Sequence, residues 1–140
     1  MKSAVIVLVV MMLIGIVVYG FSKSSRAVNS ETPVQRETTF VFIKILDSIM
    51  PIERGEKYED PLDNALKSAG LGEVTGGGSQ LGSPKADGSA SIAWVGVDVE
   101  LNDIERGVPF LVAELKKLGT PKGSTIEYSV GDKDSVITIE

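Results

Sequence analysis

The sequence predicts a small α+β domain that follows an apolar N-terminal segment. Strand patterns rich in β-branched and aromatic residues alternate along the chain with two amphipathic helix patterns. The 140 residues divide into an apolar leader, residues 1–22, a Ser/Thr-rich polar stalk, residues 23–39, and a folded part, residues 40–140. The folded part is long enough for one hydrophobic core and too short for two.

The leader predicts a single-pass transmembrane helix. Residues 4–21 carry no charge, and as a helix rising about 1.5 Å per residue they span about 27 Å, close to the hydrocarbon thickness of about 30 Å. Lys2 before this run favours an N-terminus inside and an extracytoplasmic domain. The alternative is a signal peptide cleaved near residues 25–27, which would give a secreted protein.

The first strand is expected at residues 40–46, FVFIKIL, in the centre of a sheet and buried on both faces. Residues 47–59 are charged and contain Pro51 and Gly55, so this segment is expected to be irregular.

The first helix is expected to begin with Asp60 as the N-cap and Pro61 at the first helical position. Gly70 or Gly72 would end it in a left-handed conformation. Its apolar residues recur at helical spacing and would cover a sheet; they are Leu62, Ala65, Leu66 and Ala69.

The glycine-rich residues 73–82 are expected to form an edge strand, and residues 91–101 the clearest strand of the chain. Alternation in the second of these places two sets of side chains on opposite faces. The set expected to face the helices is Ala93, Val95, Val97, Val99 and Leu101. The opposite set is Ile92, Trp94, Gly96, Asp98 and Glu100.

A second helix is expected to have an opening turn over residues 103–107 and its main part from Pro109 to a stop at Gly119. A hairpin is expected at the C-terminus, where STIEYSV and SVITIE flank GDKD.

This order of elements resembles the ferredoxin-like βαββαβ fold, an α+β sandwich in which helices pack on a sheet. The chain would add one extra C-terminal strand to it. The resemblance is one of topology, over about residues 40–130, and involves no family motif. It implies that both helices cover one sheet face, that the second strand lies at an edge, and that Trp94, Asp98 and Glu100 lie on the other, open face. Function does not follow from so common a fold.

The charge distribution disfavours nucleic acid as a partner. All 19 acidic residues follow residue 30, whereas Lys2, Lys23 and Arg26 precede it, which leaves 11 basic residues and a net charge of −8 in the remainder. Such a domain repels phosphate backbones and attracts basic protein surfaces.

The glycine stretch does not satisfy the phosphate-loop pattern. Gly72, Gly77 and Ser79 have suitable spacing, but Gly78 stands where that loop needs a lysine, and no helix pattern follows. Two interpretations of these glycines stay open. Glycines in an edge strand can mark a bulge or a close approach of another group. The bare backbone of Gly76, Gly77 and Gly78 could instead accept a partner strand.

Nothing in the sequence predicts a catalytic residue, a metal site or a cofactor. The chain has no histidine and no cysteine, which disfavours zinc, copper and iron sites and removes the usual bases for a serine nucleophile. Asp98 and Glu100 would project about 7 Å apart from one strand face, as acid and base could, but solvated carboxylates are the ordinary content of such a face.

The sequence therefore predicts a membrane-anchored, non-catalytic protein-interaction domain with a basic partner. Trp94 is the expected anchor, since tryptophan is enriched at binding hot spots. The expected partner-binding residues are Trp94, Asp98, Glu100, Glu127, Gly76, Gly77 and Gly78. One alternative is an immunity protein that neutralises a toxin. Another is a small-ligand sensor or carboxylate-dependent hydrolase with residues 47–59 as a lid.

Overall fold

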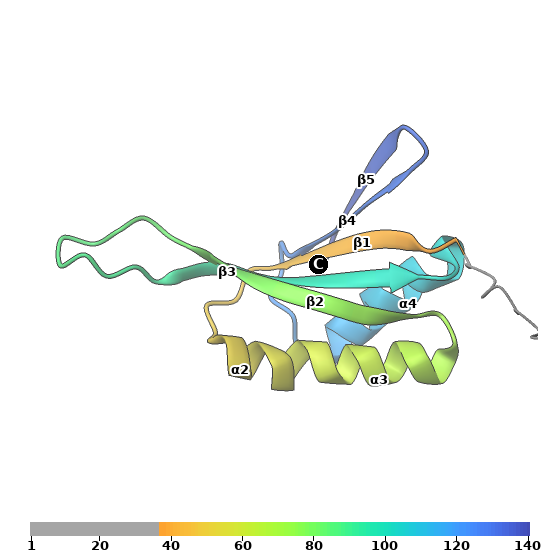
Figure 1. The fold of residues 1–140 in the computed structure, drawn as a ribbon, viewed down its shortest axis with the longest axis horizontal. Coiled ribbons are helices and arrows are strands. Elements are labelled where there is room, and N and C mark those ends of the chain that lie inside the picture. Colours follow the sequence, from red (N-terminus) through yellow and green to blue (C-terminus); the bar gives the residue numbers. More distant parts are fainter. Residues whose placement is uncertain (1–36) are drawn as a thin grey trace, which may run out of the picture. The chain divides into compact units, whose positions relative to one another are not determined.

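The computed structural model describes residues 37–140, which form a five-stranded antiparallel sheet with helices on one face (Figure 1). The elements in chain order are β1 Thr39–Ile45, α2 Pro51–Arg54, η1 Gly55–Glu59, α3 Asp60–Ala69, β2 Gly72–Leu81, β3 Ile92–Leu101, α4 Ile104–Lys117, β4 Thr125–Val130 and β5 Lys133–Thr138. The strand order is β2-β3-β1-β4-β5. The predicted α+β class is confirmed.

The predicted membrane segment, residues 4–21, lies outside the described residues. Within residues 37–140 no helix has both the length and the apolar character needed to cross a bilayer.

The core lies between the sheet and the helices. Alternate residues of β1 and β3 are buried there, as the strand period requires, and they meet the apolar stripes of α3 and α4. The fully buried members are Val41, Ile43, Ile45, Val95, Val97, Val99, Leu101, Leu62, Leu66, Leu111 and Leu115. This set confirms the predicted helix-facing positions of Val95, Val97, Val99 and Leu101. Ala93, which was predicted to face the helices with them, is exposed, because it lies at the start of β3, beside the irregular register between Gln80 and Leu81.

β1 is central in the sheet, as predicted, but the prediction that both of its faces are buried is wrong. Phe40 is 51% exposed, and Phe42 and Lys44 are half-buried. The reason is that the helices cover a single face, so every second residue of β1 points away from the core.

The prediction of an irregular segment at residues 47–59 is also wrong from Pro51 onward. Helical backbone runs from Pro51 to Ala69 and contains one π-helical turn, η1. Pro51 is tolerated because it occupies the first helical position, where no intrahelical bond is lost. Asp60 is helical (φ −62°, ψ −47°) and so does not act as the predicted N-cap.

The C-terminal ends of α3 and α4 agree with the prediction, whereas the start of α4 does not. Gly70 (φ 65°) and Gly119 (φ 72°) adopt the expected left-handed conformation after α3 and α4. α4 is continuous from Ile104, however, without a separate opening turn. Asp103 caps it by accepting a hydrogen bond from the Arg106 N–H (3.1 Å). Pro109 lies inside the helix, where the cap and the buried face offset the one bond that proline removes.

The predicted edge strand and C-terminal hairpin are both present. β2 pairs only with β3, and its register shifts between Val74 and Gly76, which is a β-bulge. β4 and β5 are joined by Gly131 and Asp132, with Gly131 at φ 59°. β5 lies at the sheet edge opposite β2.

Hydrogen bonds connect η1 to the residues that follow β1. The Asp47 Oδ2 atom accepts hydrogen bonds from Lys57 Nζ (2.8 Å) and from the hydroxyl of buried Tyr58 (2.9 Å). The hydrogen bond from Lys57 holds the pKa of Asp47 below its usual value of 3.8. The same bond raises the pKa of Lys57.

Replacing Asp47 with asparagine should lower the free energy of unfolding at pH 7 by about 1 kcal/mol, a discounted value because Lys57 is partly exposed. The folded pKa is the depressed one, so the stabilisation is present above pH 3.8 and is lost as the pH falls through the folded pKa. Urea unfolding from pH 7 downward should therefore show the two proteins converging below pH 3.8. Lys57→Met should converge with the native protein in the same way. A difference that stays constant with pH would contradict this role of Asp47.

Candidate functional site

The sheet face that carries no helix within residues 37–140 presents most of the predicted partner-binding residues; we call it the open face (Figure 1). The strand register sets their spacing. Asp98 lies opposite Phe42, and Phe42 lies opposite Glu127, so one row crosses three strands. Neighbouring strands are about 4.8 Å apart, which puts the backbones of Asp98 and Glu127 about 10 Å apart, with the backbone of Phe42 between them. This row of the open face thus has an aromatic residue at its centre and an acid on either side.

Trp94 belongs to an aromatic pair and is half-buried. Its ring meets the Phe42 ring edge to face, with centroids 6.0 Å apart. Gly96 makes this possible, because a Cβ there would lie 2.6 Å from the Phe42 ring. Lys44 Nζ lies 5.2 Å from the Trp94 ring centroid, within the range of a cation–π contact. The Trp94 ring is therefore held in place, and part of it remains accessible to a partner.

The acids of the open face are only partly engaged by other groups. Glu127 Oε1 accepts a hydrogen bond from the Thr125 hydroxyl (2.7 Å). Glu100 lies between Phe40 of β1 and Glu73 of β2, and Lys67 Nζ is 3.7 Å from Glu73. Asp98, Glu100 and Glu127 take part in no ion pair within the described residues. Their charges are therefore available to attract a cationic side chain.

The three glycines of β2 do not share one environment. Gly76 lies beside the Asp98 carboxylate, because a Cβ at Gly76 would be 3.4 Å from Asp98 Oδ2, whereas Gly78 has open space where a Cβ would be. A Cβ on Gly77 would instead collide with the Glu59 carboxylate on the helix-covered side. Gly76 and Gly78 therefore belong to the open face, whereas Gly77 does not.

An ion pair lies over Gly77 and explains the missing side chain. Arg54 Nε donates to Glu59 Oε1 across the π-helical turn, and Arg54 Nη1 donates to the Ser79 hydroxyl (3.0 Å). The Arg54 side chain is only 12% exposed. The close-approach interpretation of the glycine stretch therefore holds at Gly77.

The placement of this segment also corrects the lid hypothesis. Tyr58 is part of the core, and Arg54 and Glu59 contact β2 from the helix-covered side. Asp98 and Glu100 lie on the opposite side of the sheet, so residues 51–59 do not cover them. Among residues 37–140, no group of three or more carboxylate, histidine or cysteine side chains is arranged to hold a metal ion.

The sheet splits at one end, between β1 and β4. Their pairing stops at Val41–Tyr128, although β1 begins two residues earlier and β4 continues for two more. Beyond that point the β4–β5 hairpin diverges from β1 (Figure 1). The hollow between them, which we call the wedge, has a volume of about 580 Å³. It is lined by Thr38, Thr39, Phe40, Glu127, Tyr128, Ser129, Val130, Gly131, Asp134, Ser135 and Val136.

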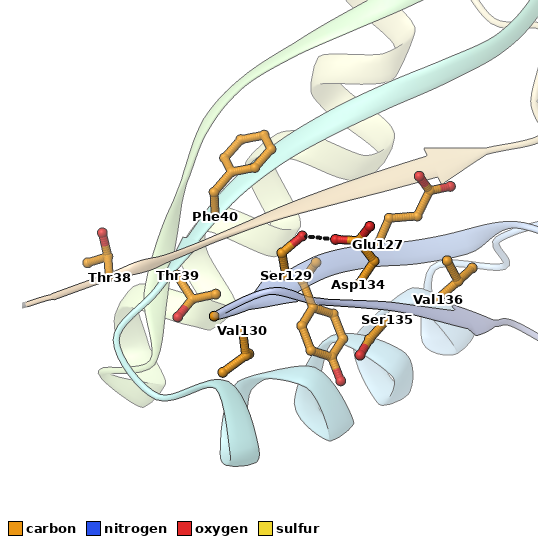
Figure 2. A pocket seen from close by; sticks show the side chains of 11 residues that line it. Thr38, Thr39, Phe40, Glu127, Ser129, Val130, Asp134, Ser135 and Val136 are labelled. Atoms are coloured by element: carbon orange, nitrogen blue, oxygen red, sulfur yellow. Dashed lines mark hydrogen bonds between the residues drawn. The ribbon is translucent and has the colours of Figure 1, made fainter.

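The side chains of the wedge point to both sides of the sheet. Figure 2 shows Phe40 and Glu127 on one side and Val130 and Ser135 on the other. The Ser129 hydroxyl donates a hydrogen bond to Asp134 Oδ1 (2.6 Å). The wedge thus combines two carboxylates with exposed apolar side chains.

Sequence reasoning missed Phe42 and Lys44 of the open face and the whole wedge. Lys44 was the available signal for this face. Alternate residues of a strand share one face, so Lys44 lies on the same face as Phe40 and Phe42, and a lysine there indicates that the face is exposed to solvent. The wedge had no comparable signal, since it depends on where the pairing of two distant strands ends.

In comparisons with known proteins, no family model, no curated protein and no solved structure matches this chain.

Proposed function

We propose that this chain is a membrane-anchored, non-enzymatic protein-interaction protein whose ferredoxin-like domain binds a basic partner through the open face. The observation that carries the proposal is the edge-to-face pair of Phe42 and Trp94 on a sheet face flanked by Asp98, Glu100 and Glu127. The strand order β2-β3-β1-β4-β5 supports the ferredoxin-like assignment, with β5 added beside β4. The uncharged residues 4–21 support the anchor, and the domain would lie outside the cytoplasm.

The composition of the open face favours a protein partner over a small substrate. A central aromatic cluster surrounded by polar groups is the usual arrangement of a binding hot spot. Phe42 and Trp94 supply the apolar centre, and the half-buried acids around them supply the rim. Lys44 is the basic side chain at the centre, where its ammonium contacts Trp94. A partner with a lysine or arginine among apolar residues complements this surface.

Electrostatics sets the expected class of partner. Acidic residues exceed basic ones in the whole chain, 19 to 14, and the open-face acids add a local negative field. Complementary charge mainly increases the rate of association and excludes partners of like charge. Basic proteins would be attracted, and nucleic acids would be repelled.

The test is crosslinking and capture of the tagged full-length chain from native membranes, followed by binding measurements with the captured protein. Trp94→Ala should weaken that binding at least about 30-fold, the size of a hot-spot loss of about 2 kcal/mol. Asp98→Lys with Glu100→Lys should abolish capture, because it reverses the charge of the rim.

A matched control carries Asp87→Lys and Asp132→Lys, which reverse two acids in turns away from the open face and give the same net charge. It should capture the partner as the native chain does. Equal capture by the open-face variant and this control would remove the open face from the proposal. Circular dichroism establishes that each variant is folded before the comparison.

A further inference from the structure

We infer that two copies of this chain pair through β5, antiparallel and across a two-fold axis at Val136, so that their five-stranded sheets join into one. β5 is the last strand of the sheet, and among the described residues it pairs with β4 alone. Three features support this pairing: backbone groups that face outward, a strand without the usual edge protections, and side chains that complement those of a second copy.

The direction of the β5 backbone groups follows from a hydrogen bond just after the strand. The Ile139 N–H donates to the Ser124 carbonyl (2.8 Å), so Ile139 bonds toward the β4 side. Bonding direction alternates along an antiparallel strand, so the N–H and C=O groups of Asp134, Val136 and Thr138 point away from β4. The two-residue turn of the hairpin gives the same alternation, because the pair that closes such a turn is hydrogen-bonded and β5 begins with that pair. All three outward residues are exposed.

β5 lacks the features that usually protect an edge strand from pairing. Its register with β4 is continuous from Lys133 to Thr138, without a bulge, and the strand contains no proline. Its one lysine is its first residue. The opposite edge, β2, is protected by a bulge after Val74 and by the hydrogen bond from the Val74 N–H to Asp63 Oδ1 (3.0 Å). Edge strands usually carry such protections, so the regular edge of β5 indicates a surface that pairs.

One register uses all of the outward backbone groups. When Val136 lies opposite Val136 of the second copy, Asp134 lies opposite Thr138 on either side of it. These three bonded pairs exchange about six hydrogen bonds. Residues directly opposite share a face, so the two exposed valines meet, and each Thr138 hydroxyl can donate to an Asp134 carboxylate. On the other face Ser135 lies opposite Ile137.

The alternative registers are less favourable. A register centred on Ser135 leaves two bonded pairs between the outward residues of β5. A register centred on Ile137 places Asp134 opposite Glu140 of the second copy, and like charges directly opposite are destabilising. In the register centred on Val136, no charged residue of β5 lies opposite a like charge.

The pairing places both open faces on the same side of the joined sheet. Val136 lies opposite Glu127 of β4, in the row that continues to Phe42 and Asp98. Because opposite residues share a face, this row continues through both valines into the second copy. A pair of copies therefore presents two open faces on one side and two layers of helices on the other.

The experiment uses single cysteines in the full-length chain, which has no cysteine of its own. Opposite residues of a bonded pair have Cα atoms about 5.5 Å apart, within the range that a disulfide spans. Mild oxidation of Val136→Cys in native membranes should therefore give a species of twice the mass on a non-reducing gel. Asp134→Cys should give at least about 10-fold less, because its two copies are four residues apart along the strands, about 14 Å. This control position is also exposed.

The register is tested with two chains that carry different tags. Asp134→Cys on one chain and Thr138→Cys on the other should link to each other, whereas Thr138→Cys alone should not link to itself. Adding Val136→Lys to both chains should reduce the linkage at least about 10-fold, because two lysines would lie directly opposite. Val136→Thr keeps the branched shape and should leave the linkage unchanged. Val136 is 63% exposed, so neither substitution should disturb the fold, and circular dichroism checks this.

Equal linkage of Val136→Cys and Asp134→Cys would overturn the inference, because it would reflect random collision. Absence of any linkage, or linkage of Val136→Cys to another protein, would also overturn it. The proposed function is decided separately, since the open-face variants carry no change in β5 and are judged by capture of the basic partner. Loss of that capture with the disulfide-linked pair intact would support both, and an absent pair with normal open-face results would reject the pairing alone.

Discussion

Replacing Tyr58 with alanine should lower the free energy of unfolding by about 4 kcal/mol, in the range found when a buried aromatic side chain is removed. Tyr58 is fully buried, and it is the residue of η1 that enters the core. The variant loses the packing of the ring, leaves a cavity, and removes the hydroxyl that donates to Asp47. Urea unfolding of the full-length chain, followed by Trp94 emission, measures the change.

Tyr58→Phe is the matched control for this variant. It keeps the ring and removes only the hydrogen bond to Asp47, so its cost should be about 1 kcal/mol. The hydroxyl is buried, and burial raises the pKa of Tyr58, so it remains protonated as a donor at neutral pH. If Tyr58→Ala cost no more than Tyr58→Phe, the ring would not pack in the core, and the helical path of residues 51–59 would be wrong.

Valine substitutions at Gly77 and Gly78 should have opposite consequences although the two residues are adjacent. A Cβ at Gly77 would collide with the Glu59 carboxylate and come within 2.8 Å of the Gly96 carbonyl oxygen. Gly77→Val should therefore displace the Arg54–Glu59 pair and strain the ladder, at a cost of about 3 kcal/mol in the free energy of unfolding. The same urea experiment measures it.

Gly78→Val is the control for the position next to it. Nothing lies within 4 Å of a Cβ at Gly78, and valine favours strands over glycine by up to about 1 kcal/mol. Stability should therefore be unchanged or slightly increased. Equal destabilisation by both substitutions would indicate that the glycines serve backbone flexibility and that the Arg54–Glu59 contact does not require Gly77.

Most elements of the fold could be predicted because the hydrophobic spacing of a strand or helix is a local property. The alternation of residues 91–101 identified β3 and both of its faces, and the glycines after each helix identified its end. The open-face positions of Trp94, Asp98 and Glu100 followed from the same alternation. Glu127 could be placed in the C-terminal hairpin, but its position in the same row as Asp98 depends on pairing with β1.

Other features were settled by contacts between residues distant in the chain. The charged residues 51–59 have the composition of an irregular segment, yet they are helical because Tyr58 enters the core and Arg54 and Glu59 lie against β2. Gly77 resembles Gly76 and Gly78 in sequence, and only the ion pair above it distinguishes them. The wedge exists because β4 leaves β1 after Tyr128. Local composition determines which segments form strands and helices, whereas the ends of pairing and the packing of charged groups depend on which segments meet.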